Sequence, residues 1–184
     1  MVHGRRFNPA GGLDLRSPER LALLEVDSVI ELTLQGAAAH TLLDVGTGVG
    51  VFAGHFAGRG VKVQGVDVSP GMLASARGFL PQLPFVAAPA EALPYCAESF
   101  DIVFLGLVLH ETDDTLRALS EARRVAKRRV AVFEWRDEEQ DFGPPRAHRL
   151  SEERIAEIAN EAGFAGMETV PLRDLVLYRL EIKG

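Results

Sequence analysis

Five short apolar runs that alternate with helical stretches constrain the fold of this chain more than any other feature. The runs span 42–45, 61–66, 85–88, 102–105 and 130–133, and the helical stretches lie near 51–57, 70–79 and 115–126. Runs that are apolar at every position are typical of parallel strands buried on both faces. Strands that alternate with helices in this order predict an α/β fold with a doubly wound parallel sheet.

The segment before these runs carries a helix start signal. Ser17 is a typical N-cap, and Pro18 and Glu19 suit the first turn, so we expect a helix that runs towards Gly36. The length of 184 residues fits one domain. We place that domain at 17–184, behind an N-terminal arm of residues 1–16.

The segments after the fifth run complete the prediction. Residues 136–150 are polar, contain prolines and are long enough to form a functional lid. Ser151 starts a further helix that we expect to end at Gly163. Two apolar runs, 166–170 and 175–182, close the chain.

Composition and charge argue against several classes of function. The net charge of −6 disfavours a nucleic-acid partner, and the basic run at 123–129 suits a solvated helix end better than a phosphate site. Cys96 is the single cysteine, so an intrachain disulfide is impossible. No apolar run approaches the roughly 20 residues of a membrane span, and no signal peptide is evident, so we expect a cytoplasmic protein. His3, His40 and His55 lack ligand-spaced partners, and we expect no metal.

A glycine loop directly after the first run is the strongest functional signal. A buried strand leads into Gly46, Gly48 and Gly50, and a helix follows. Glycines let ligand atoms approach the backbone, and the N-terminus of a helix offers free N–H groups and positive partial charge. The alternative interpretation is a strand-to-helix turn that merely requires glycine.

A carboxylate at the end of the second run supports a nucleoside site. Asp67 is expected near the same edge of the sheet, where it could accept hydrogen bonds from both ribose hydroxyls or could instead cap the next helix. Position 51 is valine, which breaks the dinucleotide spacing of glycines. Asp44 precedes the loop, where it would repel a pyrophosphate and attract an ammonium group. Both features favour a sulfonium amino-acid cofactor over a nicotinamide.

These motifs resemble those of the class I methyltransferases that use S-adenosylmethionine (SAM), in the small-molecule branch that contains the ubiquinone and menaquinone methylases. The segments 69–73, 90–95 and 99–103 are similar to further signatures of that family. The resemblance implies a Rossmann-like, doubly wound sheet of seven strands, mainly parallel, with an antiparallel C-terminal strand. It implies SAM as cofactor, a small-molecule acceptor, and cofactor contacts from Asp44, Gly46, Thr47, Gly48, Gly50, Asp67, Val68, Met72, Ala90, Glu91 and Leu107.

Two departures from the family pattern affect these expectations. The family usually has Asp where this chain has Pro89, so the adenine amino group lacks its usual partner. The Ala90 N–H or the Glu91 carboxylate could substitute. The family also tends to carry Lys-Pro-Gly-Gly where this chain has 126–129, which we interpret as a shortened turn far from the cofactor.

Few catalytic residues are expected, because a sulfonium donor is already reactive and the protein mainly aligns the two reactants. His110, after the fourth run, is the candidate general base, or it only hydrogen-bonds a local turn. Glu134 ends the fifth run beside it, and Trp135 is interpreted as a packing residue. Arg146 and Arg149 either clamp an anionic acceptor or anchor the lid, with anchoring favoured. The alternatives to a methyltransferase are a non-catalytic SAM-binding domain and, less favoured, a nicotinamide-dependent reductase.

Overall fold

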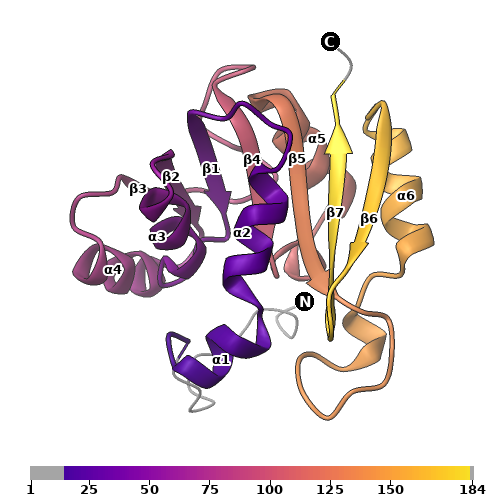
Figure 1. Cartoon of the computed structure of the whole chain (residues 1–184). Coiled ribbons are helices and arrows are strands. Elements are labelled where there is room, and N and C mark those ends of the chain that lie inside the picture. Colours follow the sequence, from indigo (N-terminus) through magenta and orange to yellow (C-terminus); the bar gives the residue numbers. More distant parts are fainter. Residues whose placement is uncertain (1–14, 183–184) are drawn as a thin grey trace.

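A seven-stranded sheet forms the centre of the protein (Figure 1). The structure is a computed structural model that describes residues 15–182. The strand order is β3-β2-β1-β4-β5-β7-β6. The strands are β1 (Thr41–Val45), β2 (Lys62–Asp67), β3 (Phe85–Ala87), β4 (Phe100–Gly106), β5 (Ala126–Trp135), β6 (Gly166–Pro171) and β7 (Leu175–Glu181). The first five pair in parallel, and β7 is antiparallel to both β5 and β6, so the predicted fold class is confirmed.

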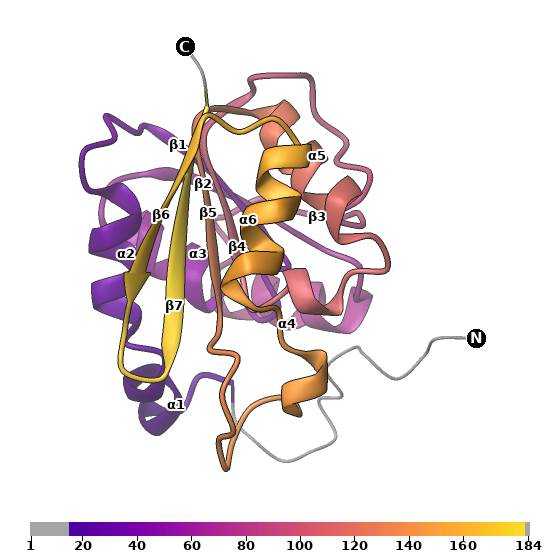
Figure 2. The same ribbon diagram turned by 90° about the vertical axis from the view of Figure 1, so that its right-hand side faces the viewer.

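Helices cover both faces of the sheet, as Figure 2 shows with the sheet seen nearly edge-on. Helices α2 (Val26–Leu34), α3 (Val51–Gly58) and α4 (Pro70–Phe79) pack on one face, and α5 (Thr115–Val125) and α6 (Glu152–Glu161) pack on the other. Side chains of a strand alternate between faces. Ala131 and Phe133 of β5 therefore join α2 and α3, whereas Val130 and Val132 join α5 and α6. Burial on both faces explains why these strands read as continuous apolar runs.

The parallel strands all end at one edge of the sheet. The glycine loop, the 3-10 turn η2 (Leu109–Glu111) and the long connection 136–150 follow β1, β4 and β5 respectively, and so begin at this edge. Helix α1 (Pro18–Leu23) lies at the same end, in the lower part of Figure 1. Ligands of doubly wound sheets bind at this edge, so the fold itself indicates where to look for a site.

The N-terminal helix is broken, which corrects the prediction of one helix running to Gly36. Helix α1 ends at Leu23, and Glu25 adopts left-handed φ of 45° before α2 begins. Leu24 and Val26 are both buried, at 2% and 3% exposed. One continuous helix would turn these two side chains about 200° apart, so it could not bury both against the same core.

Strand β5 begins earlier than predicted, directly after α5. The predicted turn at 126–129 is part of β5. Only the first residues of the basic run, before position 126, therefore lie at the end of a helix. Arg129 is buried and bonds Glu181, and it also donates to the backbone oxygens of Thr33 and Gln35 at the end of α2. The cations of this strand therefore connect elements rather than line a phosphate site.

Only two residues of the predicted N-terminal arm are described, since residues 1–14 lie outside the described part of the chain. Arg16 donates to the Val49 backbone oxygen (3.0 Å), and its guanidinium lies 4.6 Å from the centre of the Phe79 ring. Between residues 15 and 182, none of the helices combines the length and apolar character that a membrane crossing requires.

Candidate functional site

The glycine loop has the left-handed backbone conformation that favours glycine at three positions, Gly46, Gly48 and Gly50. Gly46 has φ of 68°, and a Cβ there would lie 2.4 Å from a Val108 methyl group. Gly48 has φ of 54°, but a Cβ there would meet nothing within 4 Å. Thr47 donates its N–H to Val66 of β2 (2.9 Å), which fixes the loop against the sheet. The loop thus packs tightly at Gly46 and faces open space at Gly48, where a ligand can approach the backbone.

Asp44 lies beneath this loop and is 1% exposed. Its Oδ2 accepts hydrogen bonds from Thr47 Oγ1 (2.7 Å) and from the Ala53 N–H of α3 (3.1 Å). Burial raises the pKa of Asp44 to about 7, against the effect of these two hydrogen bonds, and the nearby charge of Asp67 adds to the rise. Asp44 therefore braces the loop through Oδ2, which leaves Oδ1 for contact with a ligand.

Asp67 joins the ends of two neighbouring strands. Its Oδ2 accepts the Gly48 N–H at 2.8 Å, and its Oδ1 accepts the Ser69 N–H at 2.8 Å. Ser69 itself caps α4 by accepting the Met72 N–H, so Asp67 supports the cap without being it. Each carboxylate oxygen has a second lone pair, and both oxygens can therefore still accept a hydroxyl hydrogen.

Apolar side chains lie next to this carboxylate. Val68 directly follows Asp67 and is 43% exposed, while Met72 is half-buried in the first turn of α4. Pro89 is exposed, and Ala90 is buried against the core. None of these side chains can donate or accept a strong hydrogen bond, and that they contact the adenine ring stays a prediction.

Glu91 accepts hydrogen bonds from the backbone just before α5. Its Oε1 accepts the N–H groups of Asp113 (2.9 Å) and Asp114 (3.5 Å), and its backbone oxygen accepts from Arg117. The carboxylate therefore holds the start of α5. That Glu91 replaces the missing adenine contact stays a prediction.

The connection after β4 is strained where it passes the glycine loop. Leu107 has φ of 58°, an uncommon value for a side chain of this kind, and its N–H donates to Phe133 of β5 (2.8 Å). Val108 then packs against Gly46. Strained residues of this sort often occur at binding sites, which fits the predicted contact of Leu107 with a ligand.

His110 and Glu134 form a buried hydrogen-bonded pair, just after β4 and near the end of β5. Their side chains are 5% and 2% exposed, and His110 Nδ1 lies 2.7 Å from Glu134 Oε2. Glu134 Oε1 also accepts the backbone N–H of His110 (3.2 Å). Burial opposes protonation of the imidazole, but the charge and hydrogen bond of Glu134 outweigh it, so the pKa of His110 is raised. The imidazole thus bonds a carboxylate rather than the backbone of its own turn.

Arg149 anchors the connection 136–150, which we call the cover segment. Its guanidinium donates to the backbone oxygens of Pro144, Arg136, Glu138 and Phe142 and to the side chain of Gln140. All three nitrogens of the guanidinium are therefore engaged within the segment itself, and burial lowers the pKa of Arg149. These bonds favour the anchoring interpretation of Arg149.

Trp135 is a packing residue, as its sequence position predicted. It is 4% exposed, and its ring lies 6.0 Å from that of Phe142 and 5.7 Å from the Arg149 guanidinium. Gly143 has φ of 81°, and a Cβ there would lie 3.0 Å from the indole. The indole therefore supports the cover segment from below.

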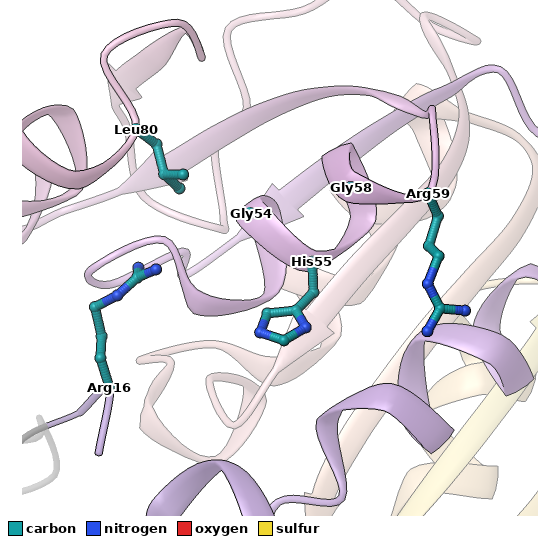
Figure 3. A pocket seen from close by; sticks show the side chains of 6 residues that line it. All are labelled: Arg16, Gly54, His55, Gly58, Arg59 and Leu80. Atoms are coloured by element: carbon teal, nitrogen blue, oxygen red, sulfur yellow. The ribbon is translucent and has the colours of Figure 1, made fainter. Parts of the chain in front are cut away.

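A separate hollow of about 350 Å³ lies against α3 (Figure 3). Gly54, His55, Gly58 and Arg59 of α3 line it together with Arg16 and Leu80. Arg59 bonds Asp27 (3.2 Å) and Glu31 (3.1 Å), so its charge is balanced by α2. None of the predicted site residues lines this hollow, and we assign it no ligand.

Two features of the site could not be read from sequence motifs. The contact of Val108 with Gly46 joins two segments that are far apart in the chain, and no residue type in either one signals it. The acceptors of Arg149 lie within the cover segment itself and are mostly backbone oxygens, which no residue type signals.

Comparison with known proteins agrees with this geometry. A family profile described as a methyltransferase domain matches residues 43–133. A demethylmenaquinone methyltransferase from Chlorobaculum tepidum is 38% identical over 95 residues, which make up 51% of this chain and 39% of that protein. The match therefore spans less than two thirds of that relative.

Solved structures extend the likeness to nearly the whole chain. A SAM-dependent methyltransferase from Aquifex aeolicus has a TM-score of 0.86 at 26% identity, and the match covers 97% of this chain and 100% of that one. A Thermotoga maritima protein described as a possible histamine N-methyltransferase has a TM-score of 0.70 at 23% identity, covers 90% and 94%, and supports the fold alone. The family profile matches the part of the chain that contains the glycine loop, and the structural likeness covers nearly all of it. This chain therefore belongs to the class I SAM-dependent methyltransferases.

Proposed function

We propose that this protein transfers the methyl group of SAM to a small-molecule acceptor. One observation carries the proposal: Gly48 N–H lies 2.8 Å from Asp67 Oδ2, so the loop and the acid that would hold the two halves of SAM are directly joined. Relatives of this chain include methyltransferases of small molecules, such as the one from Chlorobaculum tepidum. The exposed thiol of Cys96 suits a reducing compartment, so we also propose a cytoplasmic location.

The residues of the donor site fit the groups of SAM. Gly48 leaves open space at the start of α3, where the free N–H groups of a helix suit the carboxylate of the methionine moiety. Asp44 Oδ1 would face the ammonium group, and the second lone pairs of Asp67 would accept the ribose hydroxyls. When bound, SAM supplies an electrophilic methyl group. The protein binds the donor, orients it and excludes water from the reacting atoms.

The acceptor would approach from the other half of the sheet edge. His110 follows β4 and Glu134 lies near the end of β5. The cover segment follows β5 and is held by hydrogen bonds from Arg149. We place Leu107, whose backbone is strained, between these groups and the donor loop, because Val108 beside it packs against Gly46. This division gives each reactant its own wall, as alignment of two bound molecules requires.

Calorimetric titration with SAM, with its demethylated product and with NADH tests the donor site. We expect binding of the first two alone, and at least tenfold weaker binding in Asp67→Asn, because hydrogen bonds to charged groups contribute roughly 1.5–3 kcal/mol each. Gly48→Val should abolish binding, whereas His55→Asn, on the outer side of α3, should bind normally. Affinity for NADH in place of SAM would refute the proposal. Binding of SAM without turnover on any acceptor would favour a non-catalytic SAM-binding domain.

A further inference from the structure

The buried pair of His110 and Glu134 has a fixed proton arrangement. Glu134 accepts three N–H groups: His110 Nδ1 (2.7 Å), the His110 backbone (3.2 Å) and the Trp135 backbone (3.4 Å). An ionised carboxylate only accepts hydrogen bonds, so Nδ1 must carry the ring proton of a neutral imidazole. The lone pair then lies on Nε2, on the opposite side of the ring.

Nε2 has no hydrogen bond within residues 15–182. Its charged neighbour is Glu111, whose Oε1 lies 3.8 Å away, too far for a hydrogen bond. A buried imidazole with one nitrogen fixed by a carboxylate and the other able to accept is the arrangement of a general base. A histidine that served packing alone would not require a carboxylate beneath it, since burying that charge is costly.

We propose that His110 Nε2 accepts the proton of a phenolic or enolic hydroxyl of the acceptor, with Glu134 as the positioning residue. This inference rests on the proposed methyl transfer and names its substrate class. A hydroxyl oxygen is a poor nucleophile until its proton is removed, whereas a neutral amine attacks with its free lone pair and releases a proton afterwards. A base held beside the reacting atoms is therefore useful for hydroxyl acceptors above all.

The proposed step balances in atoms and electrons. The lone pair of the acceptor oxygen forms the new bond to the methyl carbon, and the electron pair of the broken carbon–sulfur bond remains on sulfur, which becomes a neutral thioether. The hydroxyl proton passes to His110 Nε2. The resulting imidazolium is stabilised by Glu134 until the proton leaves to water after product release.

Charged groups on three elements set the pH range of this base. Burial favours the neutral imidazole, whereas Glu134 of β5 and Glu111 of η2 favour the cation, and Arg149 of the cover segment opposes it. Tyr178 of β7 is buried and faces Glu134, and its hydroxyl stays protonated because burial raises its pKa. Because the pKa of His110 is raised on balance, and only the neutral ring can accept a proton, turnover should increase as pH rises through that pKa.

The first experiment compares acceptors of different acidity. Wild type and His110→Asn are supplied with methyl-labelled SAM and a panel of weakly acidic phenols, 4-nitrophenol, primary amines and carboxylic acids near pH 8. We expect the variant to lose at least about 100-fold in kcat on the weakly acidic phenols. On 4-nitrophenol, which is largely ionised at this pH, the loss should stay within about threefold, which also shows that the variant is folded. His55→Asn serves as the control and should match wild type throughout.

The second experiment isolates the role of Glu134. Glu134→Gln keeps the shape of the side chain and removes its charge, so the pKa of His110, followed by NMR of labelled histidine, should fall. The acid limb of the kcat/KM profile should move to lower pH with it, and Glu134→Asp should restore part of both. If His110 were not the base, its pKa would still fall in Glu134→Gln, but the acid limb of the kcat/KM profile would not move with it.

The outcomes separate this inference from the function on which it rests. A protein that does not bind SAM would overturn the proposed function. A protein that binds SAM but methylates amines or carboxylates, or methylates no phenol of the panel, would overturn the substrate class. An equal loss in His110→Asn on ionised and protonated phenols would overturn the role of His110 as base.

Discussion

Replacement of Asp44 by asparagine should make the ligand-free protein more stable at neutral pH. The carboxyl group has an ordinary pKa of 3.8, and burial raises it to about 7 in the folded state. Between these values the folded protein keeps a proton that the unfolded chain has released, so the free energy of unfolding falls as pH rises. One pKa unit corresponds to about 1.4 kcal/mol, which gives a total cost of about 4 kcal/mol by pH 8. The asparagine side chain cannot ionise, while its amide oxygen can still accept from Thr47 and Ala53.

Urea unfolding followed by circular dichroism, at several pH values from 4.5 to 8, measures this effect. The two proteins should differ little near pH 4.5, and Asp44→Asn should gain stability over wild type steadily up to pH 8. Asp141→Asn removes one formal charge at an exposed position and serves as control. A stability difference between wild type and Asp44→Asn that does not change with pH would refute the argument. In the proposed SAM complex the ammonium group would favour ionised Asp44, so donor affinity should weaken as pH falls below 7.

Three further predictions concern the glycine loop, the start of β1 and the cover segment. Gly46→Ala should destabilise the protein by about 3 kcal/mol, because the new methyl group meets Val108 and the backbone has positive φ; Val108→Ala in the same chain should recover part of the loss in thermal unfolding. Asp101→Ala should cost about 3 kcal/mol in urea unfolding, since it leaves two backbone N–H groups at the start of β1 without their acceptor; an unchanged midpoint would show that water replaces it. Arg149→Met should accelerate hydrogen exchange in residues 136–144 without changing SAM affinity, and equal protection in both proteins would show that the segment holds its shape without Arg149.

The fold was predictable because its signals are local. The runs that became β1 and β4 are buried at nearly every position, and such burial on both faces favours apolar residues at successive positions. The break at Glu25 was not predictable, because α1 and α2 have compatible helical spacing and only packing of Leu24 and Val26 against the sheet decides where the helix ends. The early start of β5 has the same origin, since pairing with β4 and β7 overrides the basic side chains.

The candidate site was predictable only to the level of the sheet edge. The ends of β4 and β5 are neighbours in a doubly wound sheet, so His110 and Glu134 could be expected near each other. Their hydrogen bond depends on side-chain directions that a motif does not specify. The dual bonding of Asp67 to Gly48 and Ser69 was likewise hidden, because a ribose-binding acid and a loop-bracing acid have the same sequence signature.

The position of β7 has a consequence for synthesis of the protein on the ribosome. This strand follows β6 in the chain yet lies between β5 and β6, and it pairs with every residue of β5 from Arg129 to Trp135. Until it emerges, β5 is an unpaired apolar edge, and such edges promote aggregation of nascent chains. Arg129 also lacks Glu181, its partner at the end of β7, until that point. A chain that stops before β7 would therefore leave the apolar residues 130–133 of β5 without their partner strand, and cellular quality control would have to recognise it.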